Sequence, residues 1–248
     1  MSVFTPLERP ELEAFLEPYG LGRLKDFQGI AAGSENSNFF ISLEGGEFVL
    51  TLVERGPRAD MPFFIELLER LHQAGLPVPY AVPTQGGEAL RELAGKPALL
   101  QPRLAGKHVS QPNAHHCAEI GAWLARLHLA TREHILERRS DRGLDWMLEE
   151  GPVLALELHD EQLPLLRDSL HEVAELKARI LALPRANLHA DLFIDNALFD
   201  GNQLAGVIDF YNACSGPMLY DLAIALNDWC LNERDGLDPH LTQALLGA

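Results

Sequence analysis

The chain has 248 residues, of which 47% are apolar and 23% are charged, with a formal net charge of −16. This length and composition are typical of a globular protein with one large domain or two modest lobes. The charge disfavours nucleic acid and anionic membranes as partners, and no apolar run approaches the roughly 20 residues of a membrane span.

The cysteines and the N-terminal segment indicate the compartment. Cys117, Cys214 and Cys230 are odd in number and far apart, and they lack the spacing of a metal site. They are expected to be reduced thiols. The N-terminal "MSVFTPLERPELEAF" has no basic segment before an apolar one, so no signal peptide is expected. We therefore expect a cytoplasmic protein.

The first hundred residues alternate between strand and helix patterns. A helix is expected at 9–18, and "NFFISLE" and "EFVLTLV", on either side of a Gly-Gly pair, predict a β-hairpin. The segment 61–75 has apolar residues at helical spacing and ends in Gly75, a helix stop. Two further strands are expected in "LPVPYAVPT" (76–84) and "GKPALLQPRL" (95–104).

The pattern then becomes helical, with long amphipathic stripes at 114–130 and 161–181. "QPRLAGKH" (101–108) is therefore the best linker between a β-rich and a helix-rich part. The prediction is an α+β chain with an N-lobe at 1–101, a hinge at 102–107 and a helical C-lobe at 108–248. Ligand sites are common at such junctions.

"NLHADLFIDN" (187–196) concentrates polar residues in an apolar stretch. His189, Asp191 and Asn196 have the spacing of the kinase catalytic loop, in which the Asp orients the acceptor hydroxyl and the Asn holds Mg²⁺. Asp209, at the end of the strand-like "LAGVID", occupies the place of a second metal ligand. The alternative is structural, with Asp191 capping a helix and Asp209 closing a strand. His189 is expected to brace the loop, and Asp195 to be a solvated or bracing acid.

A flexible turn upstream offers groups that can contact phosphates. "AAGSENSNFF" (31–40) is neither a P-loop nor a kinase glycine-rich motif, so the pattern alone leaves its role open. The candidate nucleotide-binding residues in it are Gly33, Ser34, Ser37 and Asn38. On the next strand, Thr51 stands where a protein kinase has its phosphate-binding Lys.

Four passages resemble the aminoglycoside-phosphotransferase-like branch of the kinase fold, and within it the bacterial homoserine kinases of that type. They are "GSENSNFF", "FVLTLVER", "LHADLFIDNALF" and "IDFYNACSGPMLYDLAIALNDWC". The resemblance spans the whole chain. It implies a two-lobed protein-kinase-like fold that transfers the γ-phosphoryl group of ATP to the hydroxyl of L-homoserine, a step in threonine biosynthesis.

The resemblance also implies roles for single residues. Asp191 would be the catalytic base, and Asn196 and Asp209 would hold Mg²⁺. Backbone groups near Gln101 and Arg103 would contact the adenine, and Thr51 would be the normal residue of the subfamily. This chain differs from the pattern at Ile194, where relatives often have a basic residue, and family members continue through further helices after "LTQALLGA".

A helix that opens with "YDLAIAL" carries three more candidates. Asp221 is expected either to cap or charge the start of this helix, or to brace the catalytic loop from below. Asp228 can pair with the ammonium group of an acceptor or be a solvated surface acid, and Trp229 is expected near the acceptor.

Other functions remain open at this stage. Within the kinase class, the rival acceptors are choline, methylthioribose and aminoglycosides, and the acidic charge does not separate them. The passage "LNDWC" favours homoserine. A nucleotide-binding pseudokinase is the alternative from another class, and the presence of Asp191, Asn196 and Asp209 argues against it.

Overall fold

The computed structural model describes residues 4–31, 36–56, 58–232 and 236–248, and their contacts divide the chain into two compact units. Unit 1 comprises 1–107 with 198–201 and 205–208, and unit 2 comprises the remaining residues. Within the described residues, no helix combines the length and the apolar character needed to cross a membrane. The prediction of an α+β chain is confirmed.

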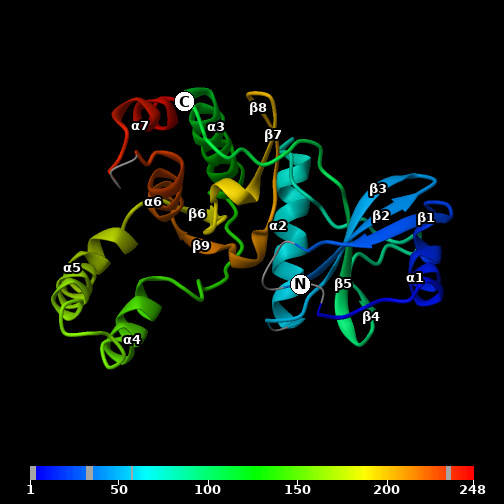
Figure 1. The fold of residues 1–248 in the computed structure, drawn as a ribbon, viewed down its shortest axis with the longest axis horizontal. Helices are drawn as coiled ribbons and strands as arrows, with labels where there is room; N and C mark the ends of the chain where they lie inside the picture. The colour runs from blue at the N-terminus through cyan, green and yellow to red at the C-terminus, as the bar shows by residue number, and fades with distance from the viewer. Residues whose placement is uncertain (1–3, 32–35, 57, 233–235) are drawn as a thin grey trace. The chain divides into compact units, whose positions relative to one another are not determined.

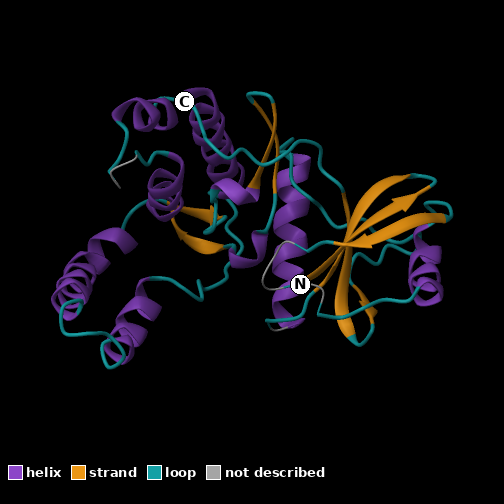
Figure 2. Cartoon of the chain, viewed as in Figure 1, coloured by secondary structure: helices purple, strands orange, loops and turns teal. Residues whose placement is uncertain are grey.

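Unit 1 is built on an antiparallel sheet with the strand order β1-β2-β3-β5-β4 (Figures 1 and 2). Its strands are β1 (Leu24–Gly29), β2 (Ser37–Leu43), β3 (Gly46–Leu52), β4 (Arg91–Leu93) and β5 (Lys96–Pro102), and its helices are α1 (Arg9–Leu16) and α2 (Met61–Gln73). Strand β2 alternates buried and partly exposed side chains, as expected for a strand with one face on the core. Phe39, Ile41 and Leu43 pack there with Leu12 and Leu16 of α1.

The predicted hairpin and the predicted helix at 61–75 are both confirmed. Strands β2 and β3 pair from Ser37↔Leu52 to Leu43↔Gly46. Gly45 is needed in the connection, because its N–H bonds to the Leu21 carbonyl and a Cβ there would lie 2.7 Å from that oxygen. Helix α2 buries the predicted apolar stripe, and Gly75 follows it with a φ of 76°.

Two expectations about unit 1 need correction. Residues 76–84 form no strand, because Pro77, Pro79 and Pro83 cannot donate ladder hydrogen bonds. Helix α1 ends at Leu16 rather than at 18, and a 3₁₀ turn at Glu17–Tyr19 follows it. Strand β5 extends to Pro102, so the predicted linker begins inside the sheet.

Unit 2 is mainly helical (Figure 2). Its elements are α3 (Ala114–Thr131), α4 (Leu144–Leu154), α5 (Leu163–Leu181), α6 (Met218–Trp229), α7 (Pro239–Leu246), and the antiparallel pair β6 (Arg185–Leu188) and β9 (Cys214–Pro217). Helix α3 packs on α7 (Figure 1), and Gly121 permits their close approach because a Cβ there would lie 2.0 Å from the Leu245 carbonyl. Trp123 and Leu127 are buried, which confirms the predicted core face.

A second hairpin joins segments of both units. Strand β7 (Ala197–Asp200) pairs with β8 (Gln203–Val207), and Phe199 bridges to Lys107. The hairpin begins directly after Asn196 and leads to Asp209, so only twelve residues lie between these two candidate site residues. It thereby connects the two polar segments singled out in the sequence.

Candidate active site

The stretch 187–196 forms a loop between β6 and β7 within unit 2. Strand β6 ends at Leu188, and a 3₁₀ turn at Ile194–Asn196 leads into β7. Ala190 has a φ of 62°, a left-handed conformation that is unusual for a residue with a side chain. Such strain persists where surrounding contacts over-determine the backbone, as is common at functional sites.

Asp191 and Asn196 are in contact. The Asn196 Nδ2 donates to the Asp191 carbonyl oxygen at 2.8 Å and lies 3.3 Å from Asp191 Oδ2. Asn212 Nδ2 donates to the same carboxylate oxygen at 3.1 Å. Asn212 was missed by the sequence reasoning, although it lies only three residues after Asp209 in the same polar segment.

A buried carboxylate supports the loop. Asp221 of α6 is 0% exposed, and its Oδ2 accepts the His189 N–H at 3.0 Å while its Oδ1 accepts the Ala190 N–H at 2.7 Å. His128 Nε2 of α3 lies 2.9 Å from Asp221 Oδ2. Hydrogen bonds to a carboxylate are stronger than those between neutral groups, so Asp221 is well suited to hold the strained peptide at Ala190. His128 was also missed, although its place on the buried face of the predicted helix was a usable signal.

His189 braces the loop from the inside. Its ring is buried, its Nδ1 accepts the Asp191 N–H at 3.2 Å, and its centroid lies 4.5 Å from that of Phe210. Trp123 packs edge-on against both rings, with centroids 6.2 Å away. This aromatic cluster connects the loop to the segment that follows Asp209.

Helix α6 contacts the outer half of the loop through two successive residues. Asp228 Oδ2 accepts the Ile194 N–H at 2.6 Å, and the Trp229 indole N–H donates to the Leu192 carbonyl at 3.0 Å. Burial, partly offset by the Ile194 N–H, raises the pKa of Asp228, and the nearby charge of Asp195 adds to this. Trp229 is fully buried, and its predicted acceptor contact stays a prediction. The acceptor role of Asp228 stays a prediction.

The two candidate metal ligands fit Mg²⁺ by the chemistry of their oxygens. The Asn196 Nδ2 is used within the loop, and no described residue donates a hydrogen bond to its Oδ1. Asp209 is exposed and has left-handed dihedral angles (φ 64°, ψ 64°). An amide oxygen and a carboxylate are hard ligands of the kind Mg²⁺ prefers.

The candidate nucleotide-binding side chains of unit 1 are bonded to protein instead. The Ser37 hydroxyl is fully buried, donates to Glu54 Oε1 at 2.6 Å and accepts the Phe4 N–H at 2.8 Å. The buried Thr51 hydroxyl donates to Asn38 Oδ1 at 2.7 Å. Ser37 lies on the face of β2 that carries Phe39 and Ile41, whereas Thr51 and Asn38 lie on the opposite face of the sheet. Because both hydroxyls are already bonded within the protein, the structure gives no support to their predicted phosphate contacts, which stay predictions.

The remaining nucleotide candidates stay predictions. The Gln101 side chain donates to the Pro79 carbonyl at 2.5 Å, and the Arg103 guanidinium lies 4.0 Å from the centroid of the Phe40 ring. The Arg103 N–H is bonded to the Glu47 carbonyl. Gly33 and Ser34 lie outside the described residues.

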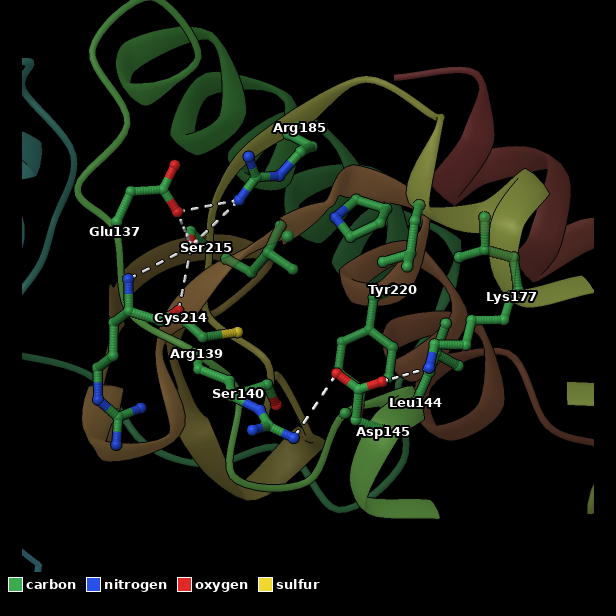
Figure 3. A pocket seen from close by; sticks show the side chains of 17 residues that line it. Glu137, Arg139, Ser140, Leu144, Asp145, Lys177, Arg185, Cys214, Ser215 and Tyr220 are labelled. Atoms are coloured by element: carbon green, nitrogen blue, oxygen red, sulfur yellow. Dashed lines mark hydrogen bonds and ion pairs between the residues drawn. The ribbon is translucent and has the colours of Figure 1, made fainter. Parts of the chain in front are cut away.

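Unit 2 also contains a cavity of about 390 Å³ that the sequence reasoning did not foresee (Figure 3). It lies among β6, β9, the end of α5, the start of α6 and the segment 137–145. The charge-rich "ERRSDRGLD" at 137–145 was the available signal.

Comparisons with known proteins agree with this geometry. Residues 26–248 match the model of the phosphotransferase enzyme family. The chain is 70% identical to the homoserine kinase of Pseudomonas aeruginosa and 42% identical to that of Methylobacillus flagellatus, each over 248 residues. These matches cover the whole of this chain and 78% and 77% of the relatives, respectively.

Solved structures show the same fold at low sequence identity. A spectinomycin phosphotransferase in complex with ADP and spectinomycin matches with a TM-score of 0.74 at 11% identity, covering 98% of this chain and 81% of that one. Amicoumacin kinase matches with a TM-score of 0.72 at 18% identity, covering 97% and 76%. The predicted two-lobed, kinase-like fold is confirmed. The chain belongs to the phosphotransferase enzyme family.

Proposed function

We propose that this protein transfers the γ-phosphoryl group of ATP to the side-chain hydroxyl of L-homoserine, giving O-phospho-L-homoserine for threonine biosynthesis. The observation that carries the proposal is the braced loop of Asp191 and Asn196, in a chain 70% identical to a homoserine kinase over its whole length. The choice of L-homoserine as the acceptor rests on the name of the relatives, and the choice of phosphoryl transfer rests on the residues of the loop.

Asp191 acts on the acceptor. Its carboxylate accepts the hydrogen bond of the homoserine hydroxyl, aims the oxygen at the γ-phosphorus and takes the proton as the new P–O bond forms. Asn212 and Asn196 fix the orientation of this carboxylate through their amide N–H groups. Asp221 and His189 hold the backbone beneath it, so that the carboxylate is positioned before the acceptor arrives.

Asn196 Oδ1 and the Asp209 carboxylate hold Mg²⁺. When bound, Mg²⁺ neutralises charge that develops on the phosphate oxygens. The protein contributes the two ligands on separate segments, one at the end of the loop and one after β8, each with a fixed backbone. For ATP we retain backbone groups near Gln101 and Arg103 and the turn at Gly33 and Ser34 as the contacts.

We place the reaction in the cytoplasm, with a small-molecule acceptor and neither nucleic acid nor membrane as a partner. The net charge of −16 supports this, because phosphate-rich surfaces repel such a chain.

ADP release measured against a panel of acceptors tests the proposal. L-Homoserine should support the highest kcat/KM, above choline, methylthioribose and an aminoglycoside. A higher kcat/KM with one of the other alcohols would replace the acceptor and keep the reaction type. Binding of Mg·ATP without ADP release for every acceptor would identify a pseudokinase.

Asp209→Asn tests the metal assignment. The variant keeps the shape of the side chain and loses an anionic Mg²⁺ ligand, so the Mg²⁺ concentration for half-maximal activity should rise and turnover should fall. Because Asp209 is exposed, the free energy of unfolding should change by less than about 0.5 kcal/mol. The exposed Asp200→Asn is the control, and an unchanged Mg²⁺ dependence in Asp209→Asn would remove Asp209 from the site.

A further inference from the structure

The cavity of unit 2 has a charge opposite to that of the chain. Among the described residues that line it, four are basic (Arg138, Arg139, Lys177 and Arg185) and two are acidic (Glu137 and Asp145). A concave surface with an excess of cations, in a chain of net charge −16, attracts an anionic group locally. Its volume of about 390 Å³ is within the usual range of small-molecule sites.

An ion pair at one side of this cavity has spare hydrogen-bonding groups (Figure 3). Arg185 Nη2 lies 3.0 Å from Glu137 Oε2 and 3.4 Å from the Ser215 hydroxyl, which donates to Glu137 at 2.7 Å. Within the described chain, no partner bonds to Arg185 Nε or Nη1, or to Glu137 Oε1. The pair can therefore receive a ligand with both donors and acceptors without first breaking its own contacts.

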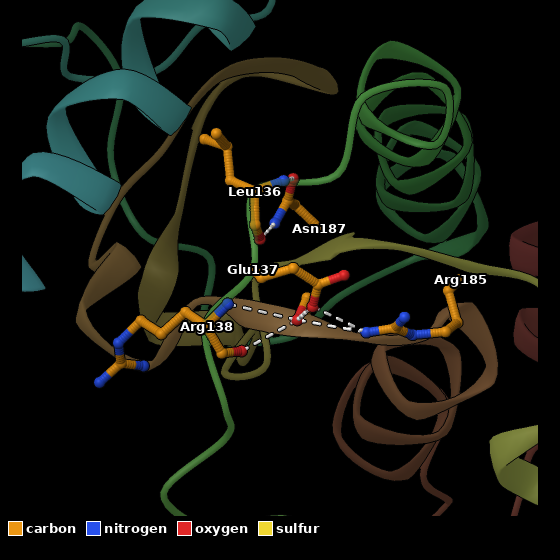
Figure 4. A network of polar contacts seen from close by, with 6 residues as sticks. Leu136, Glu137, Arg138, Arg185 and Asn187 are labelled. Atoms are coloured by element: carbon orange, nitrogen blue, oxygen red, sulfur yellow. Dashed lines mark hydrogen bonds and ion pairs between the residues drawn. The ribbon is translucent and has the colours of Figure 1, made fainter.

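Hydrogen bonds on both sides of Glu137 hold its backbone in place (Figure 4). Leu136 is held by the buried Asn187 through two hydrogen bonds, one at 3.0 Å from the Leu136 N–H and one at 2.6 Å to its carbonyl. On the other side of Glu137, the Arg138 carbonyl accepts the Ser215 N–H at 2.8 Å. Ser215 and then Arg185 lower the pKa of Glu137, so it is ionised at neutral pH.

The cavity adjoins the reacting loop within the same unit. Leu188 lines it and directly precedes His189, and Cys214 lines it two residues after Asn212, which bonds to Asp191. Burial, followed by the charges of Cys214, Asp221 and Asp191, raises the pKa of Tyr220, another lining residue. The cavity therefore shares strands β6 and β9 with the two segments that carry Asp191 and Asn212.

We propose that Arg185 and Glu137 bind the α-carboxylate and the α-ammonium group of an L-amino acid in this cavity. Given the proposed function, this amino acid is the acceptor itself. The guanidinium donates to the carboxylate from Nη1, a charge-assisted hydrogen bond. Glu137 Oε1 accepts from the ammonium group. The adjacent opposite charges of the pair match those of a zwitterion, and an acceptor without a carboxylate loses half of the recognition.

Binding titrations in the presence of a non-hydrolysable ATP analogue test this assignment. The ligands are L-homoserine, L-2-aminobutyrate, which lacks the hydroxyl, and L-homoserinol, which lacks the carboxylate. The full chain should bind L-homoserine and L-2-aminobutyrate about 10- to 100-fold more tightly than L-homoserinol, because a hydrogen bond to a charged group contributes about 1.5–3 kcal/mol.

Arg185→Gln should remove that preference. The substitution should weaken the affinity for L-homoserine and L-2-aminobutyrate by about 10- to 100-fold. The affinity for L-homoserinol should change by no more than about twofold, because Arg185 binds the carboxylate. Arg185→Lys should lose part of the preference, and Glu137→Gln should weaken all ligands that carry the ammonium group. The matched controls are Arg167→Gln and Glu161→Gln, exposed positions outside the cavity, which should bind like the unmodified chain.

The outcomes separate this inference from the proposed function. A raised KM for L-homoserine in Arg185→Gln, with kcat within about twofold, supports the acceptor subsite. If Arg185-dependent amino-acid binding is found in a chain that does not phosphorylate L-homoserine, the proposed function fails and the amino-acid site stands. In another outcome, the chain phosphorylates L-homoserine while Arg185→Gln, shown to be folded by its thermal melting curve, has the same KM for L-homoserine as the control Arg167→Gln. In that case the assignment of the acceptor subsite is wrong. In a last outcome, Arg185→Gln weakens the binding of an amino acid that inhibits the kinase reaction without competing with L-homoserine. The cavity would then be the site of an effector and not of the acceptor.

Discussion

Two regions of this molecule carry polar residues inside apolar stretches, and they use them differently. In unit 2, Asp221 and Asp228 of α6 accept hydrogen bonds from the backbone of the loop 187–196, and the Asp191 carboxylate lies within hydrogen-bond distance of Asn196 and Asn212 inside the candidate site. In unit 1, the hydroxyls of Ser37 and Thr51 bond to Glu54 and Asn38.

The two regions differ in which groups form the hydrogen bonds, but in both of them burial makes hydrogen bonds necessary. A buried polar group needs a hydrogen-bond partner, and the sequence shows this need without showing which residue is the partner. In the loop, carboxylates of α6 satisfy backbone N–H groups, and the Asp191 and Asn196 side chains bond within the candidate site. In the sheet, strands β2 and β3 satisfy the backbone, and the side chains bond to each other or to Glu54.

The largest effect is expected at Asp191. Asp191→Asn keeps the size of the side chain and removes the charge that orients the hydroxyl and takes its proton, so kcat should fall by about 10²–10⁴-fold. ATP affinity, measured separately by titration, should change little. Asp195→Asn, an exposed acid of the same loop, is the control. If a loss of ATP affinity accounted for all the lost activity, Asp191 would be a metal ligand or a fold residue.

Asp221→Ala should have the largest effect on stability. It leaves the His189 and Ala190 N–H groups and the His128 ring without their carboxylate, and each hydrogen bond to a charged group contributes about 1.5–3 kcal/mol. Urea unfolding should show the loss of stability, and the remaining folded enzyme should have a reduced kcat because the strained peptide is released. Asp168→Ala, exposed on α5, should change neither quantity. A full loss of activity with unchanged stability would contradict the bracing role.

Glu54→Gln probes the corresponding buried carboxylate of unit 1. Burial of this 8% exposed side chain acts to raise its pKa, but hydrogen bonds from Lys96, Ser37 and Thr5 outweigh it and lower the pKa below 4.5. Because the pKa is lowered in the folded state, its stabilisation is complete above the unfolded pKa and is lost as the pH falls through the folded pKa. The variant should lose about 1.5–3 kcal/mol at pH 7, and the difference from the unmodified chain should shrink as the pH falls through the lowered pKa.

Urea titrations at several pH values measure this difference. Glu69→Gln, at a partly exposed position on α2, is the control. A difference that stayed constant from pH 7 to pH 3 would show that the charge of Glu54 does not contribute.

The smallest effect is expected for Thr51→Val, which removes the hydroxyl that bonds to Asn38 and keeps the shape. Stability should fall by about 0.5–1.5 kcal/mol and the Kd for Mg·ATP should stay within about twofold. Thr51→Ser, which retains the hydroxyl, controls for the change of side chain. A tenfold rise of the Kd in Thr51→Val alone would mean that the hydroxyl contacts the nucleotide, and the contrast between the two regions would fail.

Much of the fold was predictable because its signals are local. The stripes of α2, α3 and α5 repeat every turn, and the hairpin of β2 and β3 shows alternation around a Gly-Gly turn. The segment 76–84 was mistaken for a strand because its apolar residues alternate as a strand's do. Its prolines lack the N–H groups that a ladder needs.

The candidate site divides in the same way. Asp191 and Asn196 were found by sequence because a short loop fixes their distance, so their spacing carries the chemistry. Other contacts join residues far apart in the sequence: His128 with Asp221 (93 residues), Asp228 with Ile194 (34), Asn212 with Asp191 (21) and Arg185 with Glu137 (48). No local spacing of residues predicts such contacts.

The sequence by itself therefore determined the candidate reacting groups of this protein and most of its long helices. Tertiary structure decided which polar side chains remain available to a ligand, because availability depends on whether a neighbour from a distant segment has already taken the hydrogen bond. Ser37 and Asp191 are both polar residues beside apolar runs, and only the fold buries the one against Glu54 and leaves the other partly exposed on a braced loop.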